Sequence, residues 1–330
     1  MLDIRDLRVI YKTDLETVEA INGISLRIGK GKTFGLVGET GAGKTTTALS
    51  ILRLLPHNTG RILNGEILFN GVNLLDEDEE VMRAVRGNLI SMVFQDPMSA
   101  LNPVYTVGDQ IGEAVALHNP DFTKEQVEER VDEMLKLVGI MPSRKHDYPH
   151  QFSGGMKQRT VIAVSTILNP KVLIADEPSS ALDVTSQKMV IKMMRELMEK
   201  GYIKSMLFIT HELPLLYNVT DDIMVMYAGQ IVEKGTAQEM VFDPVHPYSH
   251  GLMSSILVPE EGTRGHKLTA IPGTPPNLKK PPQGCRFAER CKYARPECRY
   301  SAIPEKDLGD GRMYRCLLGQ DELKEVYSHE

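Results

Sequence analysis

The chain has 330 residues and a mass of 36.9 kDa, enough for one large domain with an appendage or for two modest domains. Hydrophobic residues make up 42% and charged residues 25%, values that predict a packed core and exclude wholesale disorder. The net charge of −6 argues against a protein whose main ligand is a nucleic-acid backbone, because such proteins gather Lys and Arg to neutralise phosphates.

The N-terminal sequence MLDIRDLRVIYK interrupts every apolar stretch with a charge, so we expect no signal peptide. The longest apolar run that we find, residues 223–228, has six residues. A membrane span needs about 18. We therefore expect a cytoplasmic protein, or one peripheral to a membrane that another protein spans.

Strand and helix patterns alternate along the first part of the chain. A helical pattern covers residues 45–55, and strand patterns cover residues 2–11, 24–28, 33–37, 66–70 and 90–95.

From about residue 102 to residue 150 the sequence pattern changes from strand-like to helical. Residues 124–140 carry apolar side chains at helical spacing, which predicts a helical insertion. Strand patterns return at 172–175 and 206–210, with a helical pattern at 184–200 between them. This alternation predicts a mostly parallel sheet covered by helices, with phosphate ligands at the carboxyl ends of the strands.

The C-terminal part is different in kind. Beyond about Ala237 the periodic pattern loosens, and five of the eleven residues from Pro272 to Pro282 are proline, which predicts an extended connector. A segment that contains all four cysteines of the chain follows.

The segment Gly38–Thr45 reads G-x-x-x-x-G-K-T between a predicted strand and a predicted helix, the setting of a phosphate-binding loop. Backbone N–H groups would surround the phosphates, Lys44 would supply a charge, and the Thr45 hydroxyl would face Mg²⁺. The loop residues are Gly38, Glu39, Thr40, Gly41, Ala42, Gly43, Lys44, Thr45 and Thr46.

Two further elements suit a nucleotide site. Asp176 ends the apolar strand VLIAD, where its carboxylate can hold a Mg²⁺-bound water, and Glu177 follows it toward the position of a hydrolytic water. Ser153, Gly154 and Gly155 precede a helical pattern and form a glycine-rich helix start that can bind an anion.

Together the motifs GETGAGKT, VFQDP, FSGGMKQR, VLIADEP, SALD and FITHE stand in the order found in the ATP-binding cassette (ABC) ATPases, which this chain resembles over residues 1–258. Phe152 stands in place of the commoner leucine of the signature, and Met156-Lys157 also depart from it, but no catalytic position is altered. The segment HPYSHGLM, the proline-rich connector and the four cysteines are similar to the ATP-binding subunits of oligopeptide/dipeptide importers.

The resemblance implies roles for individual residues. Tyr11 would stack on adenine, Gln95 would join Thr45 and Asp176 around Mg²⁺, and Asp183 would lie at a subunit junction. Glu177 would be the general base, and His211 would contact the γ-phosphate.

It also implies the architecture: a P-loop ATPase of mostly parallel α/β type with an antiparallel β part, a helical subdomain and a small cysteine-containing extension. We expect the ATP-binding core in residues 1–95 and 151–236, the helical subdomain in 96–150 and the C-terminal extension in 237–330.

The implied function is ATP hydrolysis that powers peptide import at the cytoplasmic face of a membrane. The implied partners are a second, different ATP-binding subunit, two permease subunits, one of whose cytoplasmic helices the 96–150 region would receive, and indirectly an extracytoplasmic solute-binding protein. The alternatives are the same role in a nickel-chelate or oligosaccharide importer, a soluble ATPase that acts on nucleic acid or ribosomes, and a non-enzymatic nucleotide-binding partner. Intact Lys44, Glu177 and His211 argue against the last.

The cysteines are spaced C-x5-C-x6-C-x17-C at Cys285, Cys291, Cys298 and Cys316. Four thiolates can bind an iron–sulfur cluster or zinc, and the resemblance favours [4Fe–4S]; disulfides or free thiols are the alternatives. Five basic residues against two acidic ones between Cys285 and Tyr300 give a net charge of +3, from which we expect lowered thiol pKa values. So short a tail is expected to build little core of its own and to depend on metal.

Overall fold

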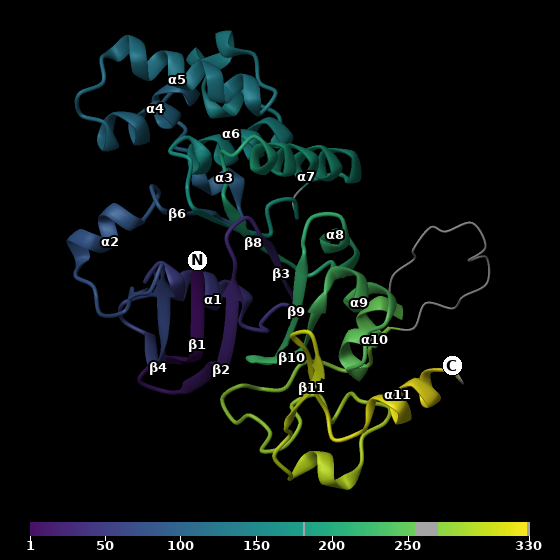
Figure 1. The fold of residues 1–330 in the computed structure, drawn as a ribbon. Coiled ribbons are helices and arrows are strands. Elements are labelled where there is room, and N and C mark those ends of the chain that lie inside the picture. Colours follow the sequence, from purple (N-terminus) through teal and green to yellow (C-terminus); the bar gives the residue numbers. More distant parts are fainter. Residues whose placement is uncertain (181, 255–269, 329–330) are drawn as a thin grey trace. The chain divides into compact units, whose positions relative to one another are not determined.

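The structure is a computed structural model that describes residues 1–180, 182–254 and 270–328 (Figure 1). Ala181 of the SALD motif, residues 255–269 and residues 329–330 lie outside the described residues. The chain divides into two compact units. The first comprises Met1–Leu2, Ile28–Thr33 and Asp76–Ile209, and the second comprises Asp3–Arg27, Phe34–Leu75 and the described residues from Thr210 onward.

The first unit is built on three parallel strands in the order β8-β7-β6. They are β6 (Ile90–Val93), β7 (Val172–Asp176) and β8 (Ser205–Thr210), whose last residue belongs to the second unit. All residues of the three strands are buried, as expected of parallel strands covered on both faces. The predicted strands at 172–175 and 206–210 are confirmed, and the one predicted at 90–95 is observed but ends at Val93.

Helices make up most of the rest of the first unit. The insertion predicted from 102 to 150 is helical: α4 and α5 pack together and contact the short 3₁₀ helix Pro142–His146. A capping box between Thr123 and Gln126 fixes the start of α5. The helices are α2 (Glu79–Val85), α3 (Pro97–Ala100), α4 (Val107–His118), α5 (Lys124–Leu137), α6 (Gly154–Thr166) and α7 (Val184–Glu199), with a second 3₁₀ helix at Pro149–Gln151.

The second unit contains two groups of strands, in the orders β11-β12-β10-β9-β3 and β2-β1-β4-β5. Strand β3 runs parallel to β9, whereas β9, β10, β12 and β11 pair antiparallel. The strands are β1 (Leu2–Lys12), β2 (Thr17–Ile28), β3 (Thr33–Val37), β4 (Gly60–Phe69), β5 (Val72–Asn73), β9 (Asp222–Tyr227), β10 (Gln230–Thr236), β11 (Glu305–Gly309) and β12 (Arg312–Arg315).

The α-helices described in the second unit have five to eight residues each. Helices α8, α9 and α10 follow one another along the chain, and α9 packs on β9 and β10 (Figure 1). They are α1 (Lys44–Ile51), α8 (Leu213–Tyr217), α9 (Ala237–Phe242), α10 (Pro247–Ser254) and α11 (Gln320–Tyr327), with a 3₁₀ helix at Pro296–Arg299.

The cysteine-bearing tail is tied to the second unit by the protein's own contacts. Strand β12 pairs with β10, with Tyr314 opposite Glu233. Tyr314, Leu318 and Leu323 form a small buried cluster with Val245 and Cys316. The tail therefore extends an existing sheet and shares a small apolar cluster with Val245 outside it, as expected of a segment that builds little core of its own.

The expectation about membrane segments can also be compared with the structure. Within residues 1–180, 182–254 and 270–328, no helix has the length and apolar character needed to cross a membrane.

Candidate nucleotide-binding site

The predicted phosphate-binding loop runs from the end of β3 to the start of α1. Gly38 has no room for a side chain, because a Cβ there would lie 2.1 Å from the Met226 carbonyl oxygen on β9. Gly41 and Gly43 have φ values of +83° and +105°, which a residue with a side chain rarely adopts. The loop thus needs its glycines for close approach and for backbone shape, which agrees with the motif.

Lys44, the first residue of α1, turns its side chain back over the loop. Its Nζ donates to the carbonyl oxygens of Gly38, at 2.6 Å, and Glu39, at 3.2 Å. Thr45 is exposed at the helix start. Tyr11 reaches the same helix, since its hydroxyl lies 3.2 Å from Thr46 Oγ1. Within the second unit the structure therefore brings Tyr11 to the loop.

Two residues that sequence reasoning missed also reach this loop. The Glu39 carboxylate receives two hydrogen bonds from Arg290, Nη1 to Oε2 at 2.8 Å and Nη2 to Oε1 at 3.0 Å. The Glu39 backbone N–H donates to the Tyr248 hydroxyl at 3.0 Å. Tyr248 belongs to HPYSHGLM and Arg290 lies between two cysteines. The sequence therefore showed both motifs, but it did not show that they contact Glu39 of the loop.

In the first unit, Asp176 and Glu177 lie at the carboxyl end of β7, where the sequence placed them. Asp176 is buried and pairs in register with Ile209. Glu177 has a left-handed backbone, with φ +50°, and its N–H donates to the Ile209 carbonyl at 2.9 Å. A glutamate in this conformation is unusual and strained by about 1–3 kcal/mol, a feature that is common where a side chain must point in one direction.

The signature segment and Asp183 each begin a helix. Ser153 caps α6 by accepting from the Met156 N–H at 3.3 Å, and no atom lies within 4 Å of a Cβ built on Gly154. Asp183 caps α7 by accepting from the N–H groups of Thr185 and Ser186. Hydrogen bonds from Ser186 lower the pKa of the Asp183 carboxyl. Ser153, Gly154 and Asp183 are exposed.

Gln95 and His211 are exposed residues that lie just beyond the ends of buried strands. Gln95 lies two residues beyond β6, and His211 comes directly after β8, with its Nε2 3.8 Å from Glu212 Oε1. Of the predicted site residues, the first unit carries Gln95, Ser153, Gly154, Gly155, Asp176, Glu177 and Asp183, and the second carries Tyr11, Gly38–Thr46 and His211.

All four cysteines line one small cavity of the second unit, together with apolar side chains such as Phe287, Ile303 and Leu318. They are free thiols, so the disulfide alternative does not match this structure. Within the described residues, no group of three or more His, Cys, Asp or Glu side chains is arranged to hold a metal ion.

The expected lowering of the thiol pKa values is wrong. Burial raises the pKa of Cys285 to about 11 and that of Cys291 to about 12, and it raises the pKa of Cys316 as well. The local excess of positive charge does not overcome this effect, because two of the arginines are already paired: Arg286 with Glu19 and Arg290 with Glu39.

Two family models match the chain. The model described as "ABC transporter" matches residues 21–180, and the model described as "Oligopeptide/dipeptide transporter, C-terminal region" matches residues 232–298. Among curated proteins, the oligopeptide transport ATP-binding protein OppD of Bacillus subtilis is 47% identical over 296 residues, 89% of this chain and 82% of that protein. The dipeptide transport ATP-binding protein DppD of the same organism is 43% identical over 98% of this chain and 96% of its own length.

Solved structures show the same fold. The ATP-binding cassette MJ0796, described as a dimer in a post-hydrolysis state with ADP and Pi, matches with a TM-score of 0.64 and 24% identity, over 72% of this chain and 99% of that one. The protein cbiO1 of Clostridium perfringens, part of the transporter complex cbiONQ, matches with a TM-score of 0.63 and 27% identity, over 73% of this chain and 90% of that one. The predicted fold class, a P-loop ABC ATPase, is confirmed.

Proposed function

We infer the function of this chain from its family, because it belongs to the ABC transporter ATP-binding proteins and carries the C-terminal region of the oligopeptide/dipeptide branch. It is an ABC-type ATPase, and its ATP hydrolysis drives peptide import through a membrane transporter. The observation that carries this conclusion is the match of both regions on one chain, at 43–47% identity to OppD and DppD over most of its length.

We propose that the predicted site residues act as the family resemblance implies. The loop Gly38–Thr46 binds the phosphates of ATP with Lys44, and Tyr11 packs on adenine. Thr45 and Gln95 would hold Mg²⁺, with Asp176 acting through a bound water, and the ion would supply charge neutralisation at the phosphates. Support comes from the local structure: a loop shaped by its glycines, a buried Asp176 at a strand end and a hydroxyl at the start of α1.

Glu177 is the general base that takes a proton from the attacking water, and His211 holds the water and the γ-phosphate in line. The left-handed backbone of Glu177 supports this role because residues in such strained conformations cluster at active sites. Ser153, Gly154 and Asp183 are exposed at helix starts and Gly155 is half-buried beside them, as a surface that meets the ATP of a second subunit would require.

The partners follow from this arrangement. A second ATP-binding subunit, different from this chain, completes two nucleotide sites, and the pair acts on two permease subunits at the cytoplasmic face of the membrane. The extracytoplasmic solute-binding protein acts only indirectly. A groove of about 750 Å³ in the first unit, lined by residues that include Phe94, Leu101, Tyr105 and Val164, supports docking of a permease helix there.

The test uses the transporter assembled in vesicles from this chain, its partner ATPase and the permease pair. We expect a solute-binding protein loaded with an oligopeptide to stimulate ATP hydrolysis several-fold, because substrate-dependent closure of the two ATPase subunits precedes hydrolysis. Stimulation by a binding protein loaded with a nickel chelate or an oligosaccharide instead would assign the chain to those importers. Co-purification with RNA rather than permease subunits would favour the soluble ATPase.

A groove variant is the control for this test. Val164→Trp would fill the groove, so it should abolish assembly with the permease while the isolated chain binds ATP as before. If the variant still assembles and responds to the loaded binding protein, the groove does not receive the permease.

We propose a [4Fe–4S] cluster as the ligand of the four cysteines. One cavity collects the four thiols, and in a cubane each thiolate binds a different iron. Zinc would require all four sulfurs about 2.3 Å from one ion. The Arg295 N–H lies 3.4 Å from Cys298 Sγ, and backbone N–H groups such as those of Phe287 and Tyr293 favour the thiolate forms of Cys285 and Cys291. Hydrogen bonds of this kind tune cluster-bound sulfur.

Anaerobic purification followed by metal analysis tests the cluster. We expect brown protein with about four irons and four sulfides per chain, and Cys298→Ser should lose most of both, because each thiolate holds one iron of the cubane. Colourless protein with one zinc per chain would contradict the cluster and leave zinc as the structural metal.

A further inference from the structure

Glu39 is the second residue of the phosphate-binding loop, and it is held from three directions. Its carboxylate accepts hydrogen bonds from both Nη atoms of Arg290. Its backbone N–H donates to the Tyr248 hydroxyl, and its carbonyl oxygen accepts from Lys44 Nζ. The two residues outside the loop come from the C-terminal extension. A loop residue fixed at its side chain and at both backbone groups cannot move without breaking several hydrogen bonds.

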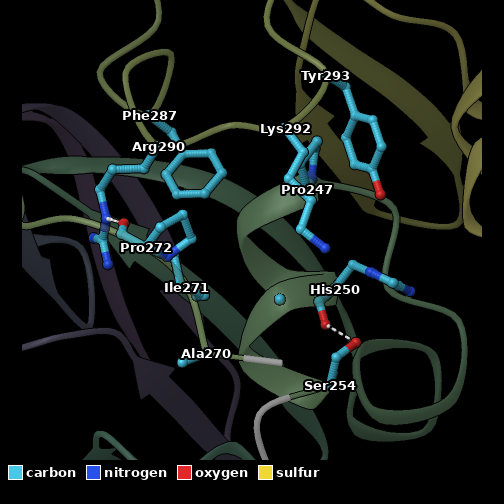
Figure 2. Close-up of a pocket in the computed structure, with 11 residues that line it drawn as sticks. Pro247, His250, Ser254, Ala270, Ile271, Pro272, Phe287, Arg290, Lys292 and Tyr293 are labelled. Carbon is cyan, nitrogen blue, oxygen red and sulfur yellow. Dashed lines mark hydrogen bonds between the residues drawn. The ribbon is translucent and has the colours of Figure 1, made fainter. Parts of the chain in front are cut away.

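Arg290 is itself held in one orientation. Its Nε donates to the Pro272 carbonyl at 2.8 Å, the bond shown in Figure 2, and its Nη1 donates to the Tyr227 hydroxyl at 3.1 Å. The guanidinium lies 5.6 Å from the Tyr227 ring centre and 5.9 Å from that of Phe287. With only 7% of its side chain exposed, Arg290 presents a fixed fork to Glu39 rather than a flexible surface charge.

Tyr248 completes the contact from a second direction. It is fully buried, and its ring packs 4.6 Å from Tyr227 and 5.3 Å from Phe287, between ring centres. Phe287 and Arg290 both lie between Cys285 and Cys291. The HPYSHGLM segment and the cysteine segment therefore share one aromatic cluster. Tyr248 and Arg290, one from each segment, both hydrogen-bond to Glu39.

We propose that Arg290 is a positioning residue for nucleotide binding: by fixing Glu39, it holds the backbone of the phosphate-binding loop in the shape that accepts phosphate. The proposal rests on the proposed ATP site and adds to it a role for the C-terminal extension. The Arg290–Glu39 ion pair thus couples the folded cysteine segment to the shape of the loop. Because coupling free energies are reciprocal, nucleotide binding stabilises the cysteine segment by the same free energy.

The test compares MgADP affinity, by calorimetric titration, in the full-length wild type, Glu39→Gln, Arg290→Gln, Arg290→Lys and the double variant Glu39→Gln/Arg290→Gln. We expect both Gln variants to bind about tenfold more weakly, within the usual range of coupling between sites. Arg290→Lys should lie between them and the wild type, because it keeps the charge but not the fork. The double variant should be no weaker than either single variant.

This design separates positioning from simple electrostatics. Removing Glu39 takes negative charge from the loop and removing Arg290 takes positive charge, so a purely electrostatic effect on the phosphates would shift the two affinities in opposite directions. Positioning predicts that both weaken. Opposite shifts, affinities within twofold of the wild type, or additive losses in the double variant would each overturn the proposal.

Arg312→Lys is the matched control. Arg312 is another buried arginine of the extension, and its guanidinium pairs with Asp243 rather than with a residue of the phosphate loop. Its replacement should leave MgADP affinity unchanged, and an equal loss there would reduce the Arg290 effect to general destabilisation. Iron and thiol content per chain, measured in every variant, show whether the cysteine segment is intact.

The same MgADP titrations also cover a variant that fails to fold and a failure of the proposed nucleotide site. Should Arg290→Gln fail to fold, Glu39→Gln carries the test, since Glu39 lies outside the cysteine segment. Wild-type protein that fails to bind MgADP would contradict the proposed nucleotide site itself, whereas normal wild-type binding that Lys44→Ala abolishes and Glu39→Gln leaves unchanged would contradict only the role of Arg290.

Discussion

Replacement of Glu177 by Gln should reduce ATP turnover by about 10²–10⁴-fold while ATP still binds, because the amide cannot take the proton of the attacking water. ATP bound without hydrolysis should hold two ATP-binding subunits together. Steady-state ATPase rates, nucleotide retained after gel filtration and the mass of the particle by light scattering measure the three parts of this expectation.

The local structure indicates that Glu177→Gln changes the charge of the side chain without changing the backbone. Glu177 has φ +50°, and its N–H donates to Ile209, but its side chain plays no part in that hydrogen bond. Gln has nearly the same shape and the same backbone preferences, so the variant removes the charge and leaves the turn unchanged. A loss of ATP binding would therefore not be explained by a misfolded turn.

Glu212→Gln is the control, because Glu212 is another carboxylate next to a predicted site residue, 3.8 Å from His211. It should keep turnover within a few-fold of the wild type. If Glu177→Gln hydrolyses ATP at the normal rate, another group is the general base and the assignment of Glu177 is wrong.

The sequence predicted best where local chemistry decides the structure. The apolar run Thr33–Val37 is bounded by Lys32 and by the glycine-rich loop, and it is β3 residue for residue. The helical pattern at 124–140 contains α5, which ends at Leu137 and whose start is fixed by a Thr123 cap that lies in the sequence itself. The phosphate loop could be predicted from its glycine spacing, because its glycines are needed either for close approach, as at Gly38, or for a positive φ, as at Gly41 and Gly43.

The sequence predicted poorly where the answer depends on distant partners. Arg290 and Glu39 lie 251 residues apart, and no local pattern links them. The charge count around the cysteines was correct, but it could not show that two of the arginines are engaged by Glu19 and Glu39 or that the thiols are buried. Backbone strain at Glu177 is equally invisible, since any residue could follow an apolar strand.

The second large effect is expected at Gly38, where Ala should weaken MgADP binding by at least about 100-fold. A Cβ there would lie 2.1 Å from the Met226 carbonyl oxygen, and Met226 belongs to β9, which pairs with β3 just before the loop. Neither backbone can move without breaking this pairing, so the loop must shift. A displacement of about 1 Å in groups that contact a ligand can cost roughly 10²-fold.

Gly41→Ala in the same loop isolates the cause. A Cβ on Gly41 has nothing within 4 Å, so this variant pays only for alanine at φ +83°, about 1–2 kcal/mol. Calorimetric titration with MgADP should therefore rank the wild type above Gly41→Ala and Gly41→Ala above Gly38→Ala, with thermal unfolding as the check that both variants are folded. Equal losses in the two would mean that backbone freedom, and not close approach to β9, is what the first glycine provides. Normal binding by Gly38→Ala would mean that the phosphates are held elsewhere.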